Sequence, residues 1–247
     1  MSRLSKREKR IQRQEGIIDK EGSINIKSFN IRKDIEPMTE SQKCAFDAWK
    51  EDYNLFLHGI AGTGKTFLAL YFAISDVFQK HSPYEKVFII RSTVPSRDQG
   101  FLPGTQKQKE AVYEEPYGPI ATTIFGRGDA YQILKQHQKV EFRSTSYLRG
   151  ATFDNCVIVV DEMQNMAGNE LHTIMTRVGH NCKIIFSGDL KQDDLTSERK
   201  KEMSGLRDFM RIIERMDEFD FIEFYPEDIV RSDLVKSYII ERDKLGL

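Results

Sequence analysis

Gly59-Ile-Ala-Gly-Thr-Gly-Lys65-Thr66 is the most informative segment of this chain. It fits the pattern G-x-x-x-x-G-K-[ST], in which the glycines let backbone N–H groups turn inward without Cβ clashes. With the amino end of the following helix, those N–H groups form a concave anion site. We expect Lys65 to reach the β- and γ-phosphates of a nucleoside triphosphate, and Thr66 to contact Mg²⁺. The residues expected to bind the nucleotide here are Gly59, Ile60, Ala61, Gly62, Thr63, Gly64, Lys65, Thr66 and Phe67.

An apolar strand that ends in two carboxylates follows further along the chain. Residues 157–160 are all β-branched, and Asp161 and Glu162 come directly after them. At the tip of a buried strand, Asp161 is expected to hold Mg²⁺ through a water, which makes Thr66 and Asp161 the expected metal-site residues. Glu162 is then free to orient and activate the attacking water. A water-directing carboxylate favours hydrolysis over phosphate transfer to a small molecule, because a small-molecule kinase must keep water out.

Polar residues also follow the next predicted strand, as Ser187-Gly188-Asp189 and then Gln192. In this position they can sense the γ-phosphate and signal to a partner surface, so Gln192 joins Lys65, Asp161 and Glu162 as a candidate catalytic residue. A simple turn is an equally good interpretation of the same residues.

Apolar runs alternate with amphipathic stretches along most of the chain. Strands are expected at 55–57, 87–90, 156–160, 183–186 and 221–224, and helices at 66–78, 170–178 and 203–216. Thr39-Glu-Ser-Gln42 is typical of a capping box that opens an earlier helix running to about residue 53, and Ser232 is positioned to cap a last one. This alternation predicts an α/β fold with a mostly parallel sheet covered by helices on both faces, the RecA/helicase-like architecture of P-loop NTPases.

The predicted domain covers residues 36–247, and residues 1–35 are expected to form a basic arm and lead-in. Six Lys or Arg residues lie within 1–14, which indicates either a solvated arm or one that touches nucleic-acid phosphates. Apolar positions between 17 and 26 suggest a short strand or extended segment. The stretch 96–119 is rich in Gly, Pro, Lys and Gln, so we expect a long irregular surface insertion there.

The overall composition is that of a protein without a membrane span or signal peptide, and it does not indicate which partner the protein binds. The 247 residues contain 37 Lys plus Arg and 38 Asp plus Glu, so net charge neither demands nor excludes nucleic acid. Three cysteines, Cys44, Cys156 and Cys182, have no close spacing, and we interpret them as buried small apolar residues in a protein of the reducing cytosol. No apolar run is long enough to cross a bilayer, and the first residues do not have the pattern of a signal peptide. A cytoplasmic location and no membrane partner are therefore expected.

With these residues assembled, the chain resembles the PhoH family, P-loop ATPases related to superfamily 1 helicases, over roughly residues 36 to 242. The motifs that carry the resemblance, in order, are Thr39 to Gln42, the phosphate loop, Arg91, Gly100-Phe-Leu-Pro-Gly104 with Lys107, Pro116-Tyr117, Pro119-Ile120, Tyr147-Leu-Arg149-Gly150, Asp161-Glu-Met-Gln164-Asn165, Gly188-Asp189-x-x-Gln192-x-Asp194-Leu195 and Val230-Arg231. The chain departs from the family pattern at Ser92, Ala151 and Ser232-Asp233. The resemblance implies ATP as the nucleotide and Mg²⁺ as the metal.

The same resemblance implies roles for four further residues. Gln42 would read the adenine edge, Gln164 and Gln192 would couple the nucleotide to a second surface, and Arg231 would lie near a γ-phosphate.

Hydrolysis also needs positive charge on the γ-phosphate beyond Lys65 and Mg²⁺, and an arginine finger contributes about 10³–10⁵ in rate. Two-lobed helicases supply it from a second lobe, for which this chain has no room. Our hypothesis is that Arg231 is donated to a neighbouring subunit of a homo-oligomer, for example a ring. The alternatives are a surface arginine or one acting within its own subunit.

Nucleic acid is the first of three targets to consider. An ATPase acting on RNA or single-stranded DNA, in the manner of a helicase or translocase, would use the candidate contacts Arg97, Lys107, Lys109, Arg143 and Arg149, with Tyr147 stacking a base. Each of these is also open to the interpretation of a solvated residue without a contact. The second possibility is an ATP-dependent switch or assembly factor acting on a protein, and the third, disfavoured by Glu162, is a small-molecule kinase.

Overall fold

Six parallel strands form one sheet in the order β3-β2-β4-β5-β1-β6. The computed structural model describes residues 26, 29–32, 35–93, 106–148, 150, 152–189 and 197–245. The strands are β1 (Asn54–Gly59), β2 (Lys86–Arg91), β3 (Val140–Ser144), β4 (Cys156–Val160), β5 (Cys182–Gly188) and β6 (Phe219–Phe224). The all-parallel sheet confirms the predicted fold class.

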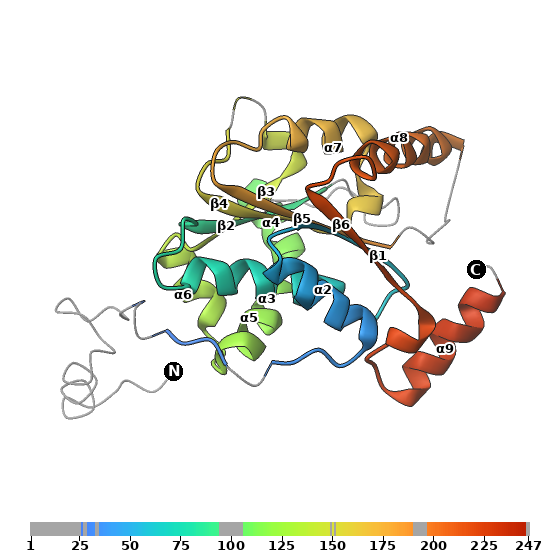
Figure 1. The fold of residues 1–247 in the computed structure, drawn as a ribbon, viewed down its shortest axis with the longest axis horizontal. Helices are drawn as coiled ribbons and strands as arrows, with labels where there is room; N and C mark the ends of the chain where they lie inside the picture. Colours follow the sequence, from blue (N-terminus) through green and yellow to red (C-terminus); the bar gives the residue numbers. More distant parts are fainter. Residues whose placement is uncertain are drawn as a thin grey trace.

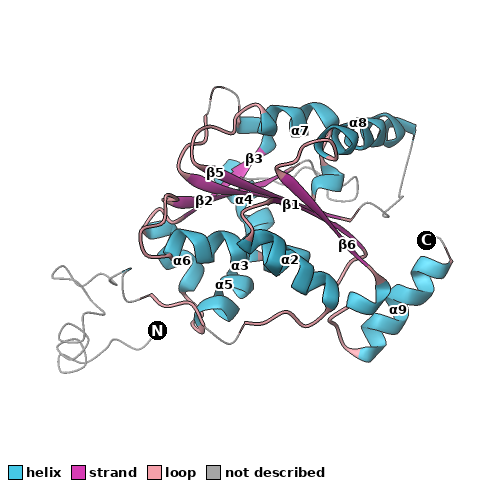
Figure 2. Ribbon diagram, in the orientation of Figure 1, coloured by secondary structure: helices cyan, strands magenta, loops and turns pink. Residues whose placement is uncertain are grey.

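Helices cover both faces of the sheet (Figure 2). One layer contains α2 (Glu40–Lys50), α3 (Lys65–Phe78), α5 (Tyr117–Phe125) and α6 (Ala130–Gln136), and the other contains α7 (Gly168–Met175) and α8 (Ser197–Ile213), as Figure 1 shows. Successive side chains of a strand point to opposite faces of the sheet, so alternate residues contact opposite helical layers. Val157 and Val159 join the core under the first layer, while Ile158 and Val160 join the core under the second.

The strand order places the polar strand ends side by side. β5 lies between β1, which leads into the phosphate loop, and β4, which leads into the acidic pair. All strands are parallel, so their carboxyl ends lie along one edge, where α/β proteins bind ligands. The residues at the end of β5, Ser187 to Asp189, therefore lie between the loop and the acidic pair.

The start of α2 confirms the predicted helix opening, with one difference. The Thr39 side chain accepts a hydrogen bond from the Gln42 N–H (3.3 Å), which satisfies one of the free donors of the first turn. The Gln42 Oε1 atom accepts from the N–H of Met38 (2.8 Å) instead of that of Thr39. The helix ends at Lys50, so the expected extension to residue 53 was wrong.

The prediction of an irregular surface insertion at 96–119 was also wrong in part. Residues Gln106–Glu114 form helix α4, and α5 begins at Tyr117. The Gln, Lys and Glu residues that suggested a surface loop are also good helix formers. Pro119 lies in the first turn of α5, where a missing N–H removes no helical hydrogen bond. Helix α6 and strand β3, which follow, were not predicted.

The packed part of the chain includes Phe29, within the predicted lead-in. Its ring is buried and stacks on Phe125 of α5, with ring centroids 4.3 Å apart. The N–H of Arg32 donates to the Ile124 carbonyl (2.9 Å). Several earlier predictions lie outside the described residues: the arm 1–14, the lead-in up to residue 25, Arg97, Arg149, Gln192 and the side chains of Lys107, Lys109 and Tyr147.

Other boundaries differ by a few residues. Helix α7 begins two residues early and ends at Met175, and α8 runs over Ser197–Ile213 instead of 203–216. A last helix, α9 (Asp233–Lys244), follows Ser232 and stands beside the two layers (Figure 1). Cys156 is buried as expected, but Cys44 is exposed and Cys182 is partly exposed, which corrects the interpretation of all three as buried. Among the described helices, none is long and apolar enough to cross a bilayer.

Candidate functional site

Close packing against β6 shapes the phosphate loop. A Cβ atom at Gly59 would collide with the Phe224 carbonyl oxygen, so the loop can leave β1 here only through glycine. Gly64 adopts a left-handed conformation (φ 88°) and is the residue before α3, which begins at Lys65. The free N–H groups of the first turn of α3 therefore lie at the loop, as an anion site requires.

The Lys65 ammonium group lies inside the loop. Its Nζ donates to the carbonyl oxygens of Gly59 (2.9 Å) and Ile60 (2.6 Å) and lies 3.4 Å from Thr63 Oγ1. Burial lowers the pKa of Lys65, and the nearby carboxylates of Asp189, Glu162 and Asp161 oppose that shift. Three partners use the three N–H bonds of the ammonium, so a phosphate must take over some of them to bind it.

Thr66 and Asp161 meet at the start of α3. The Thr66 hydroxyl donates to Asp161 Oδ1 (2.8 Å), which joins the loop directly to the end of β4. Burial raises the pKa of Asp161, and the hydrogen bonds from Thr66 and Tyr117 oppose the shift. A hydroxyl and a carboxylate side by side are hard oxygen donors, so the two residues fit the expected Mg²⁺.

Tyr117 provides a contact that the residue pattern did not reveal. Its hydroxyl donates to Asp161 Oδ2 (3.0 Å) and accepts from the Arg91 guanidinium. The side chain is fully buried, and burial raises the pKa of Tyr117 well above its usual value. Tyr117 and Arg91 had appeared only as parts of the family motifs, and Tyr117 holds one oxygen of the acidic pair from helix α5.

Glu162 and Gln164 connect the ends of β4 and β5. Gln164 Nε2 donates to Glu162 Oε2 (2.6 Å), while Gln164 Oε1 accepts from the N–H of Asp189 (3.0 Å). The Glu162 backbone is left-handed (φ 55°), a conformation that costs energy for residues other than glycine and is often found at functional sites. Burial, and then the neighbouring Asp161 charge, raise the pKa of Glu162.

One cleft of about 520 Å³ collects most of these groups. Of the predicted residues, those that line it are Gln42, Ala61, Gly62, Gly64, Lys65, Thr66, Phe67, Asp161, Glu162, Gln164, Ser187, Gly188, Asp189 and Arg231. Gly59, Ile60 and Thr63 instead build the loop: the Thr63 hydroxyl donates to the Ile60 carbonyl (3.1 Å). The site residues Glu36, Met38, Ile120 and Val230 also line the cleft and were not predicted individually.

Gln42 links α2 to the phosphate loop. Its Nε2 donates to the Thr63 carbonyl (3.0 Å), and its Oε1 accepts from Met38 N–H. An amide has two N–H bonds and two lone pairs, so one of each remains for another partner. The role of Gln42 in reading adenine stays a prediction.

Arg231 lies at the rim of the cleft in its own chain. Its Cγ atom is 3.2 Å from the position a Cβ would take at Gly62, and Ile239 of α9 reaches the same position at 3.3 Å. The arginine is exposed. Its stem therefore packs over the phosphate loop of the subunit to which it belongs.

Arg143, a candidate nucleic-acid contact, has partners within its own chain. Its guanidinium forms an ion pair with Glu141 (2.7 Å) and lies over the rings of Phe88 and Phe153. These contacts favour a structural role over a free phosphate contact.

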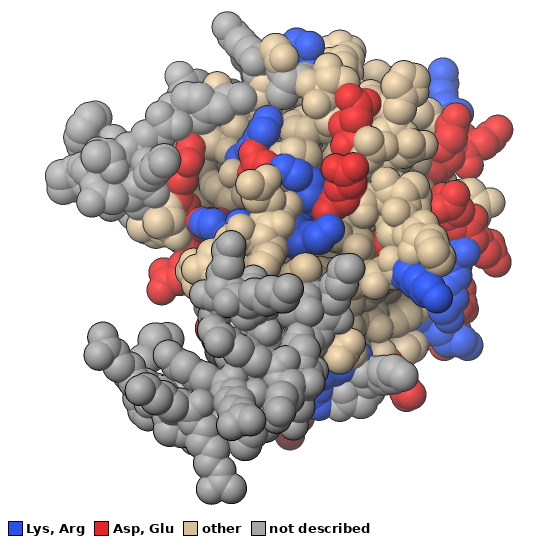
Figure 3. All heavy atoms as spheres, turned by 90° about the vertical axis from the view of Figure 1, so that its left-hand side faces the viewer, with Lys and Arg blue, Asp and Glu red and all other residues tan. Residues whose placement is uncertain are grey.

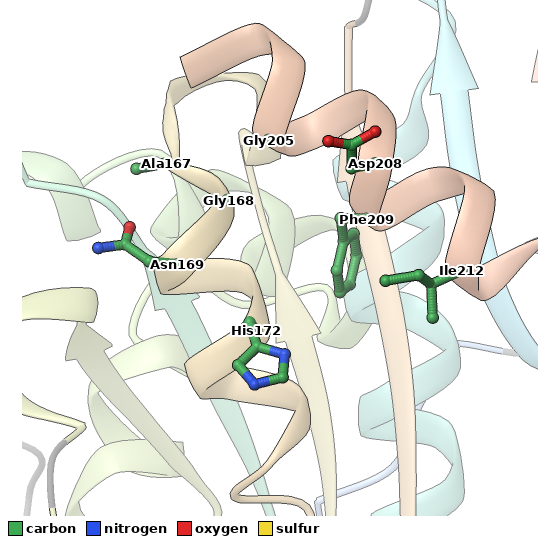
Figure 4. A pocket seen from close by; sticks show the side chains of 8 residues that line it. All are labelled: Ala167, Gly168, Asn169, His172, Gly205, Asp208, Phe209 and Ile212. Carbon is green, nitrogen blue, oxygen red and sulfur yellow. The ribbon is translucent and has the colours of Figure 1, made fainter. Parts of the chain in front are cut away.

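A second hollow, of about 430 Å³, lies between α7 and α8. The two helices approach closely because Gly168 and Gly205 meet there: a Cβ at Gly168 would lie 2.7 Å from the Gly205 Cα atom. Figure 4 shows His172 on α7 and Phe209 and Ile212 on α8 beside this hollow. It lies on the helical layer and contains none of the predicted site residues.

Comparison with known proteins gives the family. The family model described as PhoH-like protein matches residues 34–241. The PhoH-like protein of Bacillus subtilis (strain 168) is 31% identical over 93% of this chain and 69% of its own. The PhoH-like protein of Mycobacterium leprae (strain TN) is 32% identical over 84% of this chain, and Protein PhoH of Escherichia coli (strain K12) is 32% identical over 73%. This chain spans 58% and 50% of those two relatives.

The solved structures that match are much more distant in sequence. The large terminase from a thermophilic bacteriophage is 11% identical, with a TM-score of 0.48, over 82% of this chain and 50% of that one. Pif1 helicase from Candida albicans is 14% identical, with a TM-score of 0.40, over 86% and 44%. Because the family model covers most of the sequence, including both the phosphate loop and the acidic pair, this chain belongs to the PhoH-like family.

Proposed function

We propose that this chain is a Mg²⁺-dependent ATPase that acts on RNA or single-stranded DNA. The observation that carries the proposal is the meeting of Lys65, Thr66, Asp161 and Glu162 around one cleft, with Thr66 Oγ1 2.8 Å from Asp161 Oδ1. A phosphate-binding ammonium, two hard oxygen donors and a further carboxylate to direct the water are the groups that nucleotide hydrolysis needs.

Each residue has a distinct part in this proposal. Lys65 and the first turn of α3 bind the phosphates, while Thr66 and Asp161 hold Mg²⁺, which supplies positive charge for the phosphate oxygens. Glu162, oriented by Gln164, accepts a hydrogen bond from the attacking water and turns it toward the γ-phosphate. Gln42 and the apolar wall that includes Met38 and Phe67 are suited to the adenine base.

Two lysines in α4, together with contacts that lead from α4 and α5 to the metal site, favour nucleic acid over a protein as the target. Lys107 and Lys109 belong to α4, and Tyr117 at the start of α5 touches Asp161. The Arg91 guanidinium lies over the ring of Tyr113 in α4 and donates to the Tyr117 hydroxyl, so a nucleic-acid strand bound at α4 could act on Asp161 through these side chains. Basic and acidic side chains are interspersed on the face shown in Figure 3, so nucleic acid is expected to contact individual basic residues instead of a uniformly charged surface.

The test of this function is ATP hydrolysis measured with and without single-stranded RNA and DNA. We expect stimulation by at least one of them, and we expect the Lys107→Ala/Lys109→Ala variant to lose stimulation while it keeps its basal rate. Lys43→Ala removes an exposed lysine from α2 and is the matched control. Each lysine that contacts a phosphate releases a counterion and so steepens the salt dependence of nucleic-acid binding. The affinity of the double variant for nucleic acid should therefore depend less on salt. Equal turnover with and without nucleic acid would instead favour the protein-directed switch.

A second prediction concerns Tyr117. We expect Tyr117→Phe to raise the Mg²⁺ concentration needed for half-maximal ATP turnover by about 10-fold, because a residue that orients a metal ligand affects metal affinity by that order. Tyr131→Phe is the control, since the Tyr131 hydroxyl donates to Glu114 (2.8 Å) in the same helical layer. Mg²⁺ dependence is measured for both turnover and nucleotide binding. Identical Mg²⁺ curves for the two variants would remove Tyr117 from the metal site.

We also propose that the chain forms a homo-oligomer through α9. Leu234 and Tyr238 of α9, and Leu245 directly after its last residue, recur at helical spacing and are 82%, 68% and 70% exposed. None of the residues of α9 is buried. An apolar helix face open to water is typical of a protein interface, and a second copy of the chain is the partner we propose. Since Arg231 packs over the loop of its own chain, we propose that it serves its own nucleotide.

One double variant tests both proposals. We expect Leu234→Glu/Tyr238→Glu to reduce the mass measured by sedimentation velocity to that of one chain, with turnover per chain unchanged. Ile212→Glu is the control, because Ile212 is 60% exposed but lies on α8. A loss of turnover that follows dissociation would show that Arg231, or another group, is donated between subunits. An unaltered chain that is already monomeric would contradict the α9 interface.

A further inference from the structure

Two thiols meet at the edge of the sheet opposite the nucleotide cleft. Cys156 begins β4 and Cys182 begins β5, and the two residues are direct partners in the register of these strands. Their Sγ atoms are 3.5 Å apart. Neighbouring strands lie about 4.8 Å apart, within the Cα separation that a disulfide spans. The pair is 26 residues apart along the chain, so sequence spacing did not reveal it.

Hydrogen bonds fix the backbone around both cysteines. Asn155 N–H donates to the His180 carbonyl (2.9 Å), and Cys156 N–H donates to the Asn181 carbonyl (3.1 Å). The side chains of Asn155 and Asn181 are joined as well, at 2.9 Å. Closing the sulfur separation to the disulfide length of about 2.05 Å therefore requires side-chain rotation, with the strands already in place.

The two sulfurs differ in access and in reactivity. Cys156 is fully buried, while Cys182 is partly exposed. A hydrogen bond from the Cys156 thiol is the main cause that lowers the pKa of Cys182 to about 6, against burial and the Asp154 charge, which act to raise it. The Cys182 Sγ atom also lies 2.9 Å from the Phe153 carbonyl oxygen and 3.4 Å from the His180 carbonyl oxygen. Of the two sulfurs, only that of Cys182 reaches solvent, so we expect Cys182 to react first, as the thiolate.

We propose that Cys156 and Cys182 are an oxidisable dithiol that a hydroperoxide converts to an intramolecular disulfide. The Cys182 thiolate attacks one oxygen of hydrogen peroxide: an S–O bond forms, the O–O bond breaks, and the second oxygen leaves as hydroxide. The Cys156 sulfur then attacks the sulfenic sulfur, so that an S–S bond forms and the S–O oxygen leaves as water with the Cys156 proton. Overall, two thiols and one peroxide give one disulfide and two waters. This proposal does not depend on ATP hydrolysis.

The experiment uses the folded chain with Cys44→Ser, which removes the exposed thiol that could link two chains. After treatment with hydrogen peroxide, peptides from a non-reducing digest are identified by mass spectrometry. We expect a linked Cys156–Cys182 peptide and the loss of two free thiols. In a Cys156→Ser variant, Cys182 should accumulate as sulfenic acid that dimedone traps, whereas in Cys182→Ser the buried Cys156 should stay unmodified.

Two results would overturn the proposal. One is that both thiols stay free at peroxide concentrations that oxidise Cys44 in the unaltered chain. The other is that Cys156 in the Cys182→Ser variant is modified as fast as Cys182 in the Cys156→Ser variant. Circular dichroism before and after treatment checks that each variant remains folded, so that the reactivity measured is that of the native sheet.

Discussion

We expect Lys65→Ala to lose ATP binding, with turnover at least about 100-fold below that of the unaltered chain, because removing one donor to a developing phosphate charge has an effect of this order. The Lys65 ammonium lies within hydrogen-bonding distance of the Gly59 and Ile60 carbonyls, at the centre of the loop. Alanine removes both the charge and the group that holds these carbonyls, so the phosphate loses its partner and the loop loses an internal contact. Binding is measured by calorimetry with ATP and Mg²⁺, and turnover by phosphate release.

A second buried lysine provides the control for stability. Lys183 is 5% exposed, donates to the Trp49 carbonyl (3.1 Å) and pairs with Asp52. Lys183→Ala also removes an ammonium group from a backbone carbonyl, and an unpaired buried group costs about 1–3 kcal/mol, so both variants should unfold at lower temperature. Only Lys65→Ala should lose nucleotide binding. Hydrolysis at the normal rate by Lys65→Ala would rule out the phosphate loop as the site.

Glu162→Gln should bind ATP normally yet hydrolyse it about 10²–10⁴-fold more slowly, the range attributed to a positioned general base. Glutamine has nearly the same shape but cannot accept the proton of the attacking water. It can still accept the hydrogen bond from Gln164 Nε2, so the link between β4 and β5 should remain. Single-turnover phosphate release isolates the chemical step, and calorimetry measures binding.

Glu141→Gln controls for the loss of a partly buried carboxylate. Glu141 forms ion pairs with Lys86 and Arg143 on β2 and β3, away from the cleft residues. This variant should hydrolyse ATP at the normal rate. Turnover by Glu162→Gln that matches Glu141→Gln would mean that another group directs the water.

Local patterns predicted the elements that position the site. The β-branched residues before Asp161 and the glycines before Lys65 favour a strand and a phosphate loop through local backbone preferences. These predictions therefore did not depend on distant contacts. The polar α4 sequence gave no clear pattern, because an exposed helix and a loop share Gln, Lys and Glu. Helix α6 and strand β3 were missed although several of their apolar residues, such as Leu134 and Val140, are buried, because the segments are short.

The contacts within the site were less accessible to sequence reasoning. The pairing of Tyr117 with Asp161 joins residues 44 positions apart, and it exists because α5 lies beside the end of β4. Gln164 was assigned a coupling role through the family resemblance, but its bonds to Glu162 and Asp189 follow from the adjacency of β4 and β5. The stem of Arg231 packs on Gly62 of its own loop, and the donation of Arg231 to a neighbouring subunit stays a prediction.

The phosphate loop, the acidic pair and the parallel α/β architecture could all be predicted from the residues alone. The local spacing of glycines, charged residues and apolar side chains predicts each of these features. The contacts between distant residues became known only from the folded chain: Thr66 with Asp161 across 95 residues, Tyr117 with the same carboxylate, and Cys156 with Cys182. The distances between these side chains depend on the strand order and on the packing of the helices. Both are set when the whole chain buries its apolar surface, so no local pattern predicts them.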